Sequence, residues 1–227
     1  MTQGVDNGAQ PATDAPRVLI VDDHDLFRTG LRNLLEEQSV NVVGEAATGE
    51  EAVRAVRQAT PDVVVMDLNM PGMSGVDATR QITAEAPLTR VVVLTISDQD
   101  GDVMNAILAG ACGYLLKDSS IQELMRGINA AAIGESLISP HIAAKVLQRV
   151  RASMTLPDAA ESIRTELSDR EIEVLKLIAN GKDNADIAAE LCISPKTVKN
   201  HISNILMKLQ IQNRIQAAVY AVRSGIV

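Results

Sequence analysis

Aromatic side chains are nearly absent from this sequence. Its 227 residues include no tryptophan, one phenylalanine and two tyrosines. A ligand pocket lined by several aromatic rings is therefore excluded. The 46% of apolar residues is nevertheless enough to build a sizeable core in one or two domains.

Long apolar runs, a secretion signal and a cysteine framework are also missing. No run approaches the ~18 residues that span a bilayer. The first sixteen residues are polar and lack a positive start or an apolar centre. We therefore expect a cytoplasmic protein with no membrane partner. Cys112 and Cys192 are too far apart for a metal motif, and we expect two small buried thiols in a reducing compartment.

Charge is divided unevenly along the chain. Basic residues number 12 against 22 acidic residues over 1–163, but 9 against 7 over 164–227. From Leu191 to the end there are five basic residues and no acidic one. Such a segment suits an anionic partner, but a solvated helix face has the same composition, and charge alone favours the second interpretation.

Strand-like and helix-like segments alternate from Arg17 to about Ile138. The strand-like segments read RVLIV, NVVGEA, DVVVMD, RVVVLT and GYLL. The helical patterns run over Leu26–Glu37, Gly49–Ala59, Val76–Ala84, Asp102–Leu108 and Ile121–Ala132. This alternation predicts a parallel five-stranded sheet with helices on both faces, which is a doubly wound α/β domain.

The segment VVVMDLNMPGMSG, residues 63–75, points to a functional edge of that sheet. Its unbroken Val/Met run predicts a strand buried on both faces, and the run stops at Asp67 just before a proline-glycine turn. Ligands of open parallel sheets bind at the carboxyl ends of the strands. Asp67 is therefore a candidate site residue, with its carboxylate expected to be exposed at the strand end.

Further polar residues follow the other strands. They are Asp22, Asp23, Thr95 and Lys117. Because the carboxyl ends of parallel strands share one edge, we expect them to gather around Asp67. Clustered carboxylates repel one another without a cation, so the set predicts Mg²⁺ and phosphoryl chemistry. The alternative is that some of these acids only cap the next helix. We do not expect His24 to be a ligand, because consecutive residues at a strand end should not all point at one ion.

Beyond residue 138 the pattern changes. Residues 139–163 contain a helical stretch and then a polar segment with one proline, which predicts a linker. From residue 164 only helical patterns follow. LSDREIEVLKLIANGK opens with Ser168 and Glu171 as a capping box, and SPKTVKNHISNILMKL opens with Ser194 as N-cap. With the short helix between them they predict a helix-turn-helix.

The last of these helices has two distinct faces. One face is apolar and is expected to be buried through Val198, Ile202, Ile205, Leu206 and Leu209. The opposite face offers donors for phosphates and base edges from Lys196, Lys199, Asn200 and Ser203.

These motifs resemble those of a known family. VLIVDDH, DVVVMDLNMPGMSG, VVVLTIS and GACGYLLKD are similar to the receiver domain of two-component response regulators, and the last 60 residues resemble the LuxR-type DNA-binding domain. The whole chain thus resembles the NarL/FixJ class. The resemblance implies a flavodoxin-like (CheY-like) receiver over 17–138 with strand order 2-1-3-4-5. It also implies an all-α four-helix DNA-binding domain over 164–227, and residues 1–16 are expected to be a disordered tail.

The same resemblance implies roles for the receiver residues. Asp67 would accept a phosphoryl group from a sensor histidine kinase. Mg²⁺ would be held by Asp22, Asp23, Asp67 and the backbone carbonyl of Asn69. Lys117 and Thr95 would bind the phosphoryl group, and Tyr114 would rotate inward as the switch aromatic. No enzymatic activity is expected beyond this transfer and a slow dephosphorylation.

In the DNA-binding domain the resemblance implies that contacts to base edges come from Lys199, Asn200 and Ser203. Contacts to phosphates would come from Lys196, Thr197 and His201. We expect phosphorylation to favour a homodimer on double-stranded promoter DNA, with RNA polymerase as a further partner. The helix Arg214–Ser224 would be a dimer surface through Ala217, Ala218, Ala221 and Val222. Gln210 stands where the family usually has glycine, and a left-handed conformation there would cost roughly 1 kcal/mol.

Three alternatives remain at this stage. The first is a receiver-type regulator that works without phosphorylation. The second is an aspartyl-phosphate phosphohydrolase, although such enzymes usually carry a second acid where this chain has Asn69. The third, a quorum-sensing LuxR protein, is disfavoured because this chain lacks the aromatic residues of its ligand pocket.

Overall fold

The structure is a computed structural model that describes residues 15–97, 99–138, 142, 146 and 167–227. The predicted N-terminal tail and linker therefore lie outside the described residues, apart from Ala15, Pro16, Ile142 and Val146. No helix within the described ranges has the length and apolar character of a membrane span.

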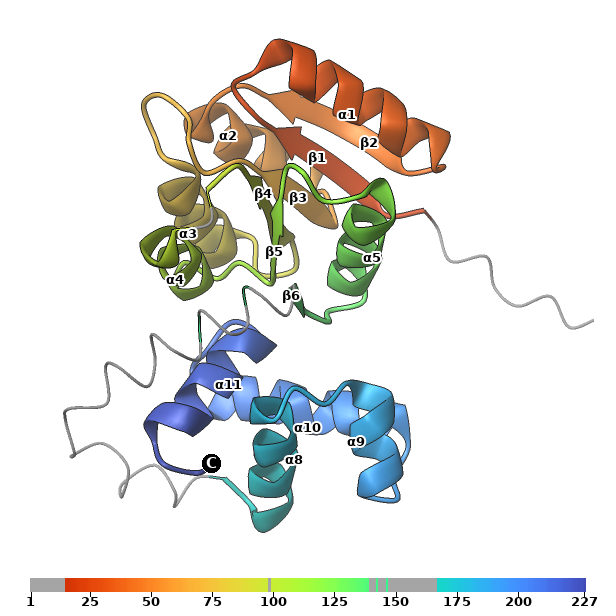
Figure 1. The fold of residues 1–227 in the computed structure, drawn as a ribbon, viewed down its shortest axis with the longest axis vertical. Coiled ribbons are helices and arrows are strands. Elements are labelled where there is room, and N and C mark those ends of the chain that lie inside the picture. The colour runs from red at the N-terminus through yellow and green to blue at the C-terminus, as the bar shows by residue number, and fades with distance from the viewer. Residues whose placement is uncertain (1–14, 98, 139–141, 143–145, 147–166) are drawn as a thin grey trace, which may run out of the picture.

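The N-terminal domain is built on a parallel sheet with strand order β2-β1-β3-β4-β5-β6 (Figure 1). The strands are β1 (Arg17–Val21), β2 (Asn41–Ala46), β3 (Val63–Met66), β4 (Arg90–Thr95), β5 (Gly113–Leu116) and β6 (Leu137–Ile138). The first five follow the predicted order 2-1-3-4-5, and β3 is buried along its whole length as predicted. The short strand β6 was not predicted, because two residues are too few to show a strand pattern.

Helices cover both faces of this sheet. They are α1 (Asp25–Glu37), α2 (Gly49–Ala59), α3 (Gly75–Glu85), α4 (Asp100–Leu108) and α5 (Ile121–Ala132). Alternate residues of β1 point to opposite faces. Ile20 packs in a cluster with Leu35 of α1 and other residues of α5, whereas Leu19 packs in a second cluster with Val56 of α2 and residues of α3. The doubly wound architecture is therefore confirmed.

The C-terminal domain consists of helices in its described residues. They are α8 (Asp169–Ala179), α9 (Asn184–Glu190), α10 (Pro195–Lys208) and α11 (Arg214–Arg223). The predicted capping box of Ser168 and Glu171 opens α8, and the Ser194 side chain caps α10. Val198, Ile202 and Ile205 of α10 are buried in a core shared with α8, α9 and α11.

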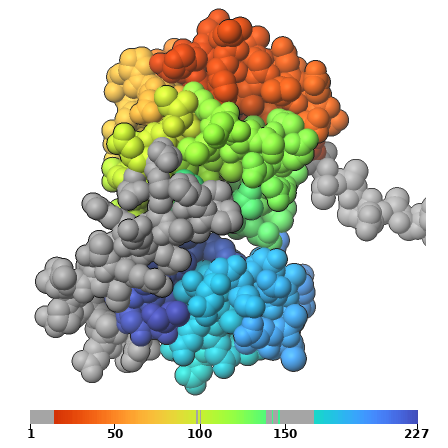
Figure 2. Space-filling view, viewed as in Figure 1, coloured from red at the N-terminus to blue at the C-terminus, as the bar shows by residue number. Residues whose placement is uncertain are grey.

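Helix α11 also packs against the N-terminal domain. Its residues Ile215, Val219 and Val222 share an apolar cluster with Ile107 of α4 and Tyr114 of β5. Figure 1 shows α11 on the side of α4 and β5, and Figure 2 shows the N-terminal domain above the C-terminal domain. The two domains are thus joined through a helix that belongs to the cores of both.

Hydrogen bonds reinforce this contact. The Asn213 Nδ2 donates to the carbonyl oxygen of Ala111 at 2.9 Å, and Asn213 is buried. The Gln216 Nε2 donates to the carbonyl oxygen of Ile107 at 2.9 Å. Both acceptors lie in or just after α4, so the start of α11 is anchored at a defined point of the other domain.

In the docked chain, three of the four α11 residues expected at a dimer surface are buried. Ala217 and Ala221 are fully buried in the core of their own domain, and Val222 lies against the N-terminal domain. Small residues were interpreted as a surface for close helix approach, but here they serve the approach of helices within one chain.

The two cysteines differ in exposure. Both are free, as expected, and Cys112 is buried, which raises the pKa of its thiol to about 11. Cys192 is exposed, so the prediction of a buried thiol is wrong at this position. It follows α9 with a φ of 53°, in a turn at the surface rather than on an apolar helix face. Gln210 is left-handed as predicted, with a φ of 53°.

Candidate functional site: an acidic pocket and a DNA-binding helix

Backbone hydrogen bonds that continue the sheet place the acidic residues and the lysine. The N–H of Asp22 donates to the last residue of β2 at 3.1 Å, that of Asp67 to the last residue of β1 at 2.9 Å, and that of Lys117 to the last residue of β4 at 2.9 Å. Each residue therefore stands one step beyond a strand end, and the rigid sheet determines where its side chain begins.

The lysine lies between two of the carboxylates. Lys117 Nζ is 2.6 Å from Asp22 Oδ2 and 2.7 Å from Asp67 Oδ2. The other oxygen of Asp67 accepts the backbone N–H of Leu68 at 2.7 Å. Asp67 is only 2% exposed, so the expectation of an exposed carboxylate is wrong. Its two oxygens face Lys117, which follows β5, and the backbone N–H of Leu68.

Two opposing effects act on the ammonium group of Lys117. Burial lowers its pKa, but the hydrogen bonds to Asp22 and Asp67 outweigh burial, and the pKa is raised above its ordinary value. The ring of Phe27 in α1 lies 4.5 Å from Nζ, within the range of a cation–π contact. Lys117 is therefore a firmly held cation beside the candidate phosphoacceptor.

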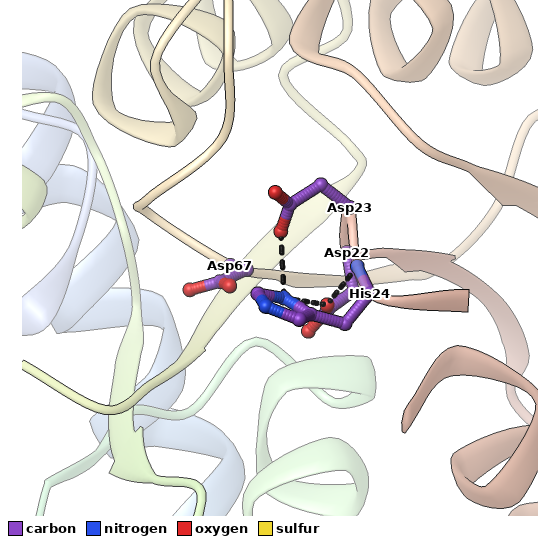
Figure 3. Close-up of side chains that lie close together, drawn as sticks. All are labelled: Asp22, Asp23, His24 and Asp67. Carbon is purple, nitrogen blue, oxygen red and sulfur yellow. Dashed lines mark hydrogen bonds and ion pairs between the residues drawn. The ribbon is translucent and has the colours of Figure 1, made fainter. Parts of the chain in front are cut away.

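Asp23 and His24 complete the pocket (Figure 3). One ligand atom from each of Asp22, Asp23, His24 and Asp67 lies within 4.8 Å of the others. His24 Nδ1 is 2.9 Å from Asp23 Oδ1, so the argument that consecutive residues could not converge is wrong. The extended backbone of His24, at the N-cap of α1, lets its ring fold back toward the aspartates.

This pocket fits a hard divalent cation. Its donors are mainly carboxylate oxygens. Asp23 Oδ1 is buried and makes no hydrogen bond among the described residues, and the group beside it is the His24 ring nitrogen, which balances its charge only when the ring is protonated. A buried carboxylate oxygen is costly unless a cation approaches it. Mg²⁺ prefers oxygen ligands over an imidazole nitrogen, so the three aspartates are the better ligands and His24 the poorer one.

Thr95 and Tyr114 lie in the interior next to this edge. Both are fully buried, and the Tyr114 hydroxyl donates to the carbonyl oxygen of Ser97 at 2.8 Å. The backbone N–H of Ser97 lies 3.4 Å from Thr95 Oγ1. The short segment after β4 thus connects the two predicted switch residues, and the Tyr114 ring already lies inside, beneath α11.

The predicted DNA contacts lie on one side of α10. Lys196, Lys199, Asn200 and Ser203 are exposed, while Thr197 and His201 are half-buried. Thr197 also belongs to the helix cap, since its N–H donates to Ser194 Oγ at 3.1 Å. The expected division between a buried and an exposed face is present for Val198, Ile202 and Ile205, whereas Leu206 and Leu209 are only half-buried.

Comparisons with known proteins agree with both domains. Residues 18–129 match the response regulator receiver domain, and residues 165–221 match the bacterial regulatory proteins of the luxR family. The transcriptional regulatory protein LiaR of Bacillus subtilis is 47% identical over 93% of this chain and 99% of its own length. The chain belongs to the LuxR-type response regulators.

Other members of this family of response regulators are similar over nearly the whole chain. The response regulator protein VraR of Staphylococcus aureus is 39% identical over 93% of this chain and 98% of its own. The crystal structure of ChrA, from a heme-sensing two-component system, has 35% identity and a TM-score of 0.52 over 94% of this chain and all of its own. The structure of an RcsB–DNA complex has 27% identity and a TM-score of 0.54 over 92% of this chain and 98% of its own.

Two residues of this response regulator were missed by sequence reasoning. Phe27, which packs on Lys117, was not singled out, although its being the only phenylalanine of the chain was a possible signal. Glu135 follows α5 and contacts α10 of the other domain, with its Oε1 3.8 Å from Lys199 Nζ. A single glutamate between a helix and a short strand has no sequence feature that indicates such a contact.

Proposed function

We propose that this response regulator is switched by phosphorylation of Asp67 and then binds promoter DNA through α10. In the transfer, the N–P bond of a phosphohistidine on the sensor kinase breaks and a bond from a carboxylate oxygen of Asp67 to phosphorus forms. The observation that carries this proposal is the pocket itself, where Asp22, Asp23 and Lys117 surround one carboxylate at a sheet edge.

The residues around Asp67 have separate tasks in this proposal. The three aspartates and the backbone carbonyl of Asn69 would hold Mg²⁺, which supplies positive charge against the phosphoryl oxygens. Lys117 would leave Asp22 and pair with the phosphoryl group, since one ammonium group and a cation cannot share the same carboxylate oxygens. Thr95 would donate its hydroxyl to the phosphoryl group.

The apolar cluster offers a route from the pocket to the DNA-binding domain. Tyr114 contacts the same cluster as Ile107 of α4 and Val219 of α11. A movement of Thr95 toward the phosphoryl group would shift the segment around Ser97 and with it the Tyr114 ring. The packing of α11 against this ring would then weaken. Shifting the ratio of active to inactive protein from 1:99 to 99:1 requires about 5.5 kcal/mol. The new bonds to the phosphoryl group and a dimer contact would both contribute to this free energy.

Release of α11 would leave the C-terminal domain free to dimerise on DNA. Lys199, Asn200 and Ser203 would face base edges, and Lys196, Thr197 and His201 would face phosphates. We assign the receiver to 17–138, the linker to 139–163 and the DNA-binding domain to 164–227. The protein would act in the cytoplasm with a sensor histidine kinase and RNA polymerase, and it would catalyse only its own phosphoryl transfer and slow dephosphorylation.

The test combines phosphorylation with selection of DNA sites. Wild type, Asp67→Asn and Asp118→Asn are treated with acetyl phosphate and Mg²⁺, and each is used to select sites from random DNA. Asp118 is exposed next to Lys117, so its variant controls for loss of one charge near the pocket. We expect wild type and Asp118→Asn to gain one phosphoryl group by intact mass and to bind a shared motif more tightly. Equal mass gain or equal DNA affinity for Asp67→Asn would refute the proposed role.

A further inference from the structure

One carboxylate of the receiver meets several groups of the DNA-binding domain. Glu135 lies in the turn between α5 and β6, and its Oε1 accepts a hydrogen bond from Asn184 Nδ2 at 3.0 Å. The same oxygen is 3.8 Å from Nζ of Lys199, in the exposed face of α10. A receiver oxygen thus contacts both helices of the helix-turn-helix, α9 and α10.

Asn184 extends this contact to a third helix. It is 8% exposed, and its Oδ1 accepts Nη1 of Arg214 at 2.7 Å. Burial lowers the pKa of the Arg214 guanidinium, while the charges of Glu135 and Asp183 act in the opposite direction. Glu135 therefore supplies negative charge to a region in which the C-terminal domain presents a half-buried arginine and an exposed lysine.

We propose that Glu135 acts as a substitute for DNA, occupying Lys199 and the start of α9 while the domains are docked. The inference rests on the proposed function, because it assumes that α10 is the DNA-binding helix, and it adds the receiver residue that competes with DNA. Lys199 cannot pair with Glu135 and with a base edge at once. DNA is a strong competitor, since a duplex carries one negative charge per ~1.7 Å of its axis.

The contact is suited to a reversible competitor. Glu135 and Lys199 are 36% and 44% exposed, and ion pairs of such exposure contribute little and are screened by salt. The bond from the buried Asn184 to an ionised acceptor is the stronger part. The apolar cluster and the bonds of Asn213 and Gln216 hold the domains together, whereas Glu135 acts on the DNA-binding groups.

The test compares Glu135→Gln with Glu37→Gln. Glutamine retains an oxygen that can accept the bond from Asn184 but removes the charge, and Glu37 is an exposed carboxylate on α1 that controls for the change in net charge. Binding of the full chain to a mixed-sequence DNA duplex is measured with and without acetyl phosphate. We expect Glu135→Gln to bind about threefold or more tightly without phosphorylation. Its affinity after phosphorylation should equal that of wild type, and Glu37→Gln should match wild type in both states.

A second measurement reports the competition without DNA. Cys192 is exposed and Cys112 is buried, so a spin label on Cys192 and another on an introduced Asn33→Cys give one distance between the domains. We expect a narrow distribution of label-to-label distances for wild type, and a broader distribution with a longer mean distance for Glu135→Gln. Adding salt should broaden the wild-type distribution more than that of the variant.

The outcomes separate this inference from the proposed function. Equal affinities of Glu135→Gln and Glu37→Gln without phosphorylation would overturn the role of Glu135. An equal increase in the DNA affinity of Glu135→Gln with and without phosphorylation would also overturn this role. The charge of Glu135 would then repel DNA directly and not through the docked domains. Failure of the phosphorylation response would appear instead as equal affinity of wild type and Asp67→Asn after acetyl phosphate, while Glu135→Gln would still bind more tightly.

Discussion

At the scale of single residues, Lys117 supplies the positive charge that two buried acids of the pocket require. Its ammonium group bridges Asp22 and Asp67, two carboxylates that are almost completely buried. Buried carboxylates need a compensating positive charge. Lys117 thus stands where a cation is required, and it competes with any metal that binds the same oxygens.

Replacing Lys117 by methionine tests this competition. We expect Lys117→Met to bind Mg²⁺ at least about threefold more tightly than wild type, because a neighbouring positive charge is removed. Without Mg²⁺ the variant should be less stable, since two buried carboxylates lose their partner. Calorimetric Mg²⁺ titration and thermal unfolding measure the two effects, and Lys176→Met on the exposed side of α8 is the control. Unchanged or weaker Mg²⁺ binding by Lys117→Met would contradict the competition.

Gln210 is a residue with unfavourable backbone geometry. It is exposed and left-handed after α10, with a φ of 53°. We expect Gln210→Gly to raise the free energy of unfolding by about 0.5–1 kcal/mol, because glycine adopts this conformation without a steric penalty. The same change in the right-handed helix α2, Gln58→Gly, should lower it by about 1 kcal/mol. Urea denaturation measures both, and a destabilised Gln210→Gly would show that the turn does not strain this residue.

At the scale of the helices, the two capping boxes within the described residues differ in their basic partner, which is Arg126 at 3.9 Å for the box of α5 and Lys208 at 2.7 Å for the box of α8. Ser120 and Glu123 open α5, and Ser168 and Glu171 open α8. Only the box of α8 includes a lysine among its described contacts, since Lys208 Nζ lies 2.7 Å from Glu171 Oε2. This ion pair joins the start of α8 to the end of α10, so it contributes to the orientation of α10 relative to α8.

Glu171 makes the stability of the C-terminal domain depend on pH. Burial raises the pKa of its carboxyl group, but the bonds to Lys208 and Ser168 outweigh burial, so the folded pKa lies below the ordinary 4.5. The unfolded state then binds the proton first. The stabilisation is therefore present above about pH 4.5 and is lost as the pH falls through the lower folded value.

Glu171→Gln should remove this pH dependence. We expect the variant to be less stable than wild type at neutral pH and to lose less further stability when the pH falls below 4.5. Glu123→Gln removes the corresponding carboxylate of α5 and serves as the control, since its box lacks the lysine. Circular dichroism during urea denaturation at several pH values measures the difference. Parallel pH profiles of wild type and Glu171→Gln would contradict the assignment.

At the scale of the whole molecule, α11 belongs to two cores at once. Ala217 and Ala221 are buried in the C-terminal domain, while Ile215 and Val219 lie in the cluster with Tyr114. Separating the domains therefore exposes one apolar face of α11 and the surface over Tyr114 together. Exposed apolar faces favour association with other copies, so opening and dimerisation are physically coupled.

Asn213 is the residue at which this docking can be altered without loss of the helix cap. Its Oδ1 accepts the N–H of Gln216 to cap α11, and its Nδ2 donates to Ala111. Asn213→Asp should keep the cap but place a carboxylate against a carbonyl oxygen, which repels it. We expect a larger radius of gyration by X-ray scattering for Asn213→Asp than for wild type. Asn213→Ser, which retains a neutral cap, should stay closer to wild type, and equal radii for all three would contradict the role of this bond.

The sequence by itself determined the strands, their order through the family resemblance, the helix caps and the residues that gather at the sheet edge. These features are local or periodic: a run such as Val63–Met66 indicates burial on both faces, and Ser168 with Glu171 indicates a helix start. Polar residues directly after parallel strands must share one edge, so Asp67 and Lys117 were expected to lie together.

Only the tertiary structure decided how these parts cover one another. The burial of Asp67, the inward position of the Tyr114 ring and the contact of Glu135 with Lys199 each depend on residues far away in the chain. The small residues of α11 are compatible with several partners, and the pattern cannot distinguish a second copy from the same chain. Packing of Ala217 and Ala221 against the other helices of their own domain makes that choice, because burial is a property of the surfaces that meet and not of either segment alone.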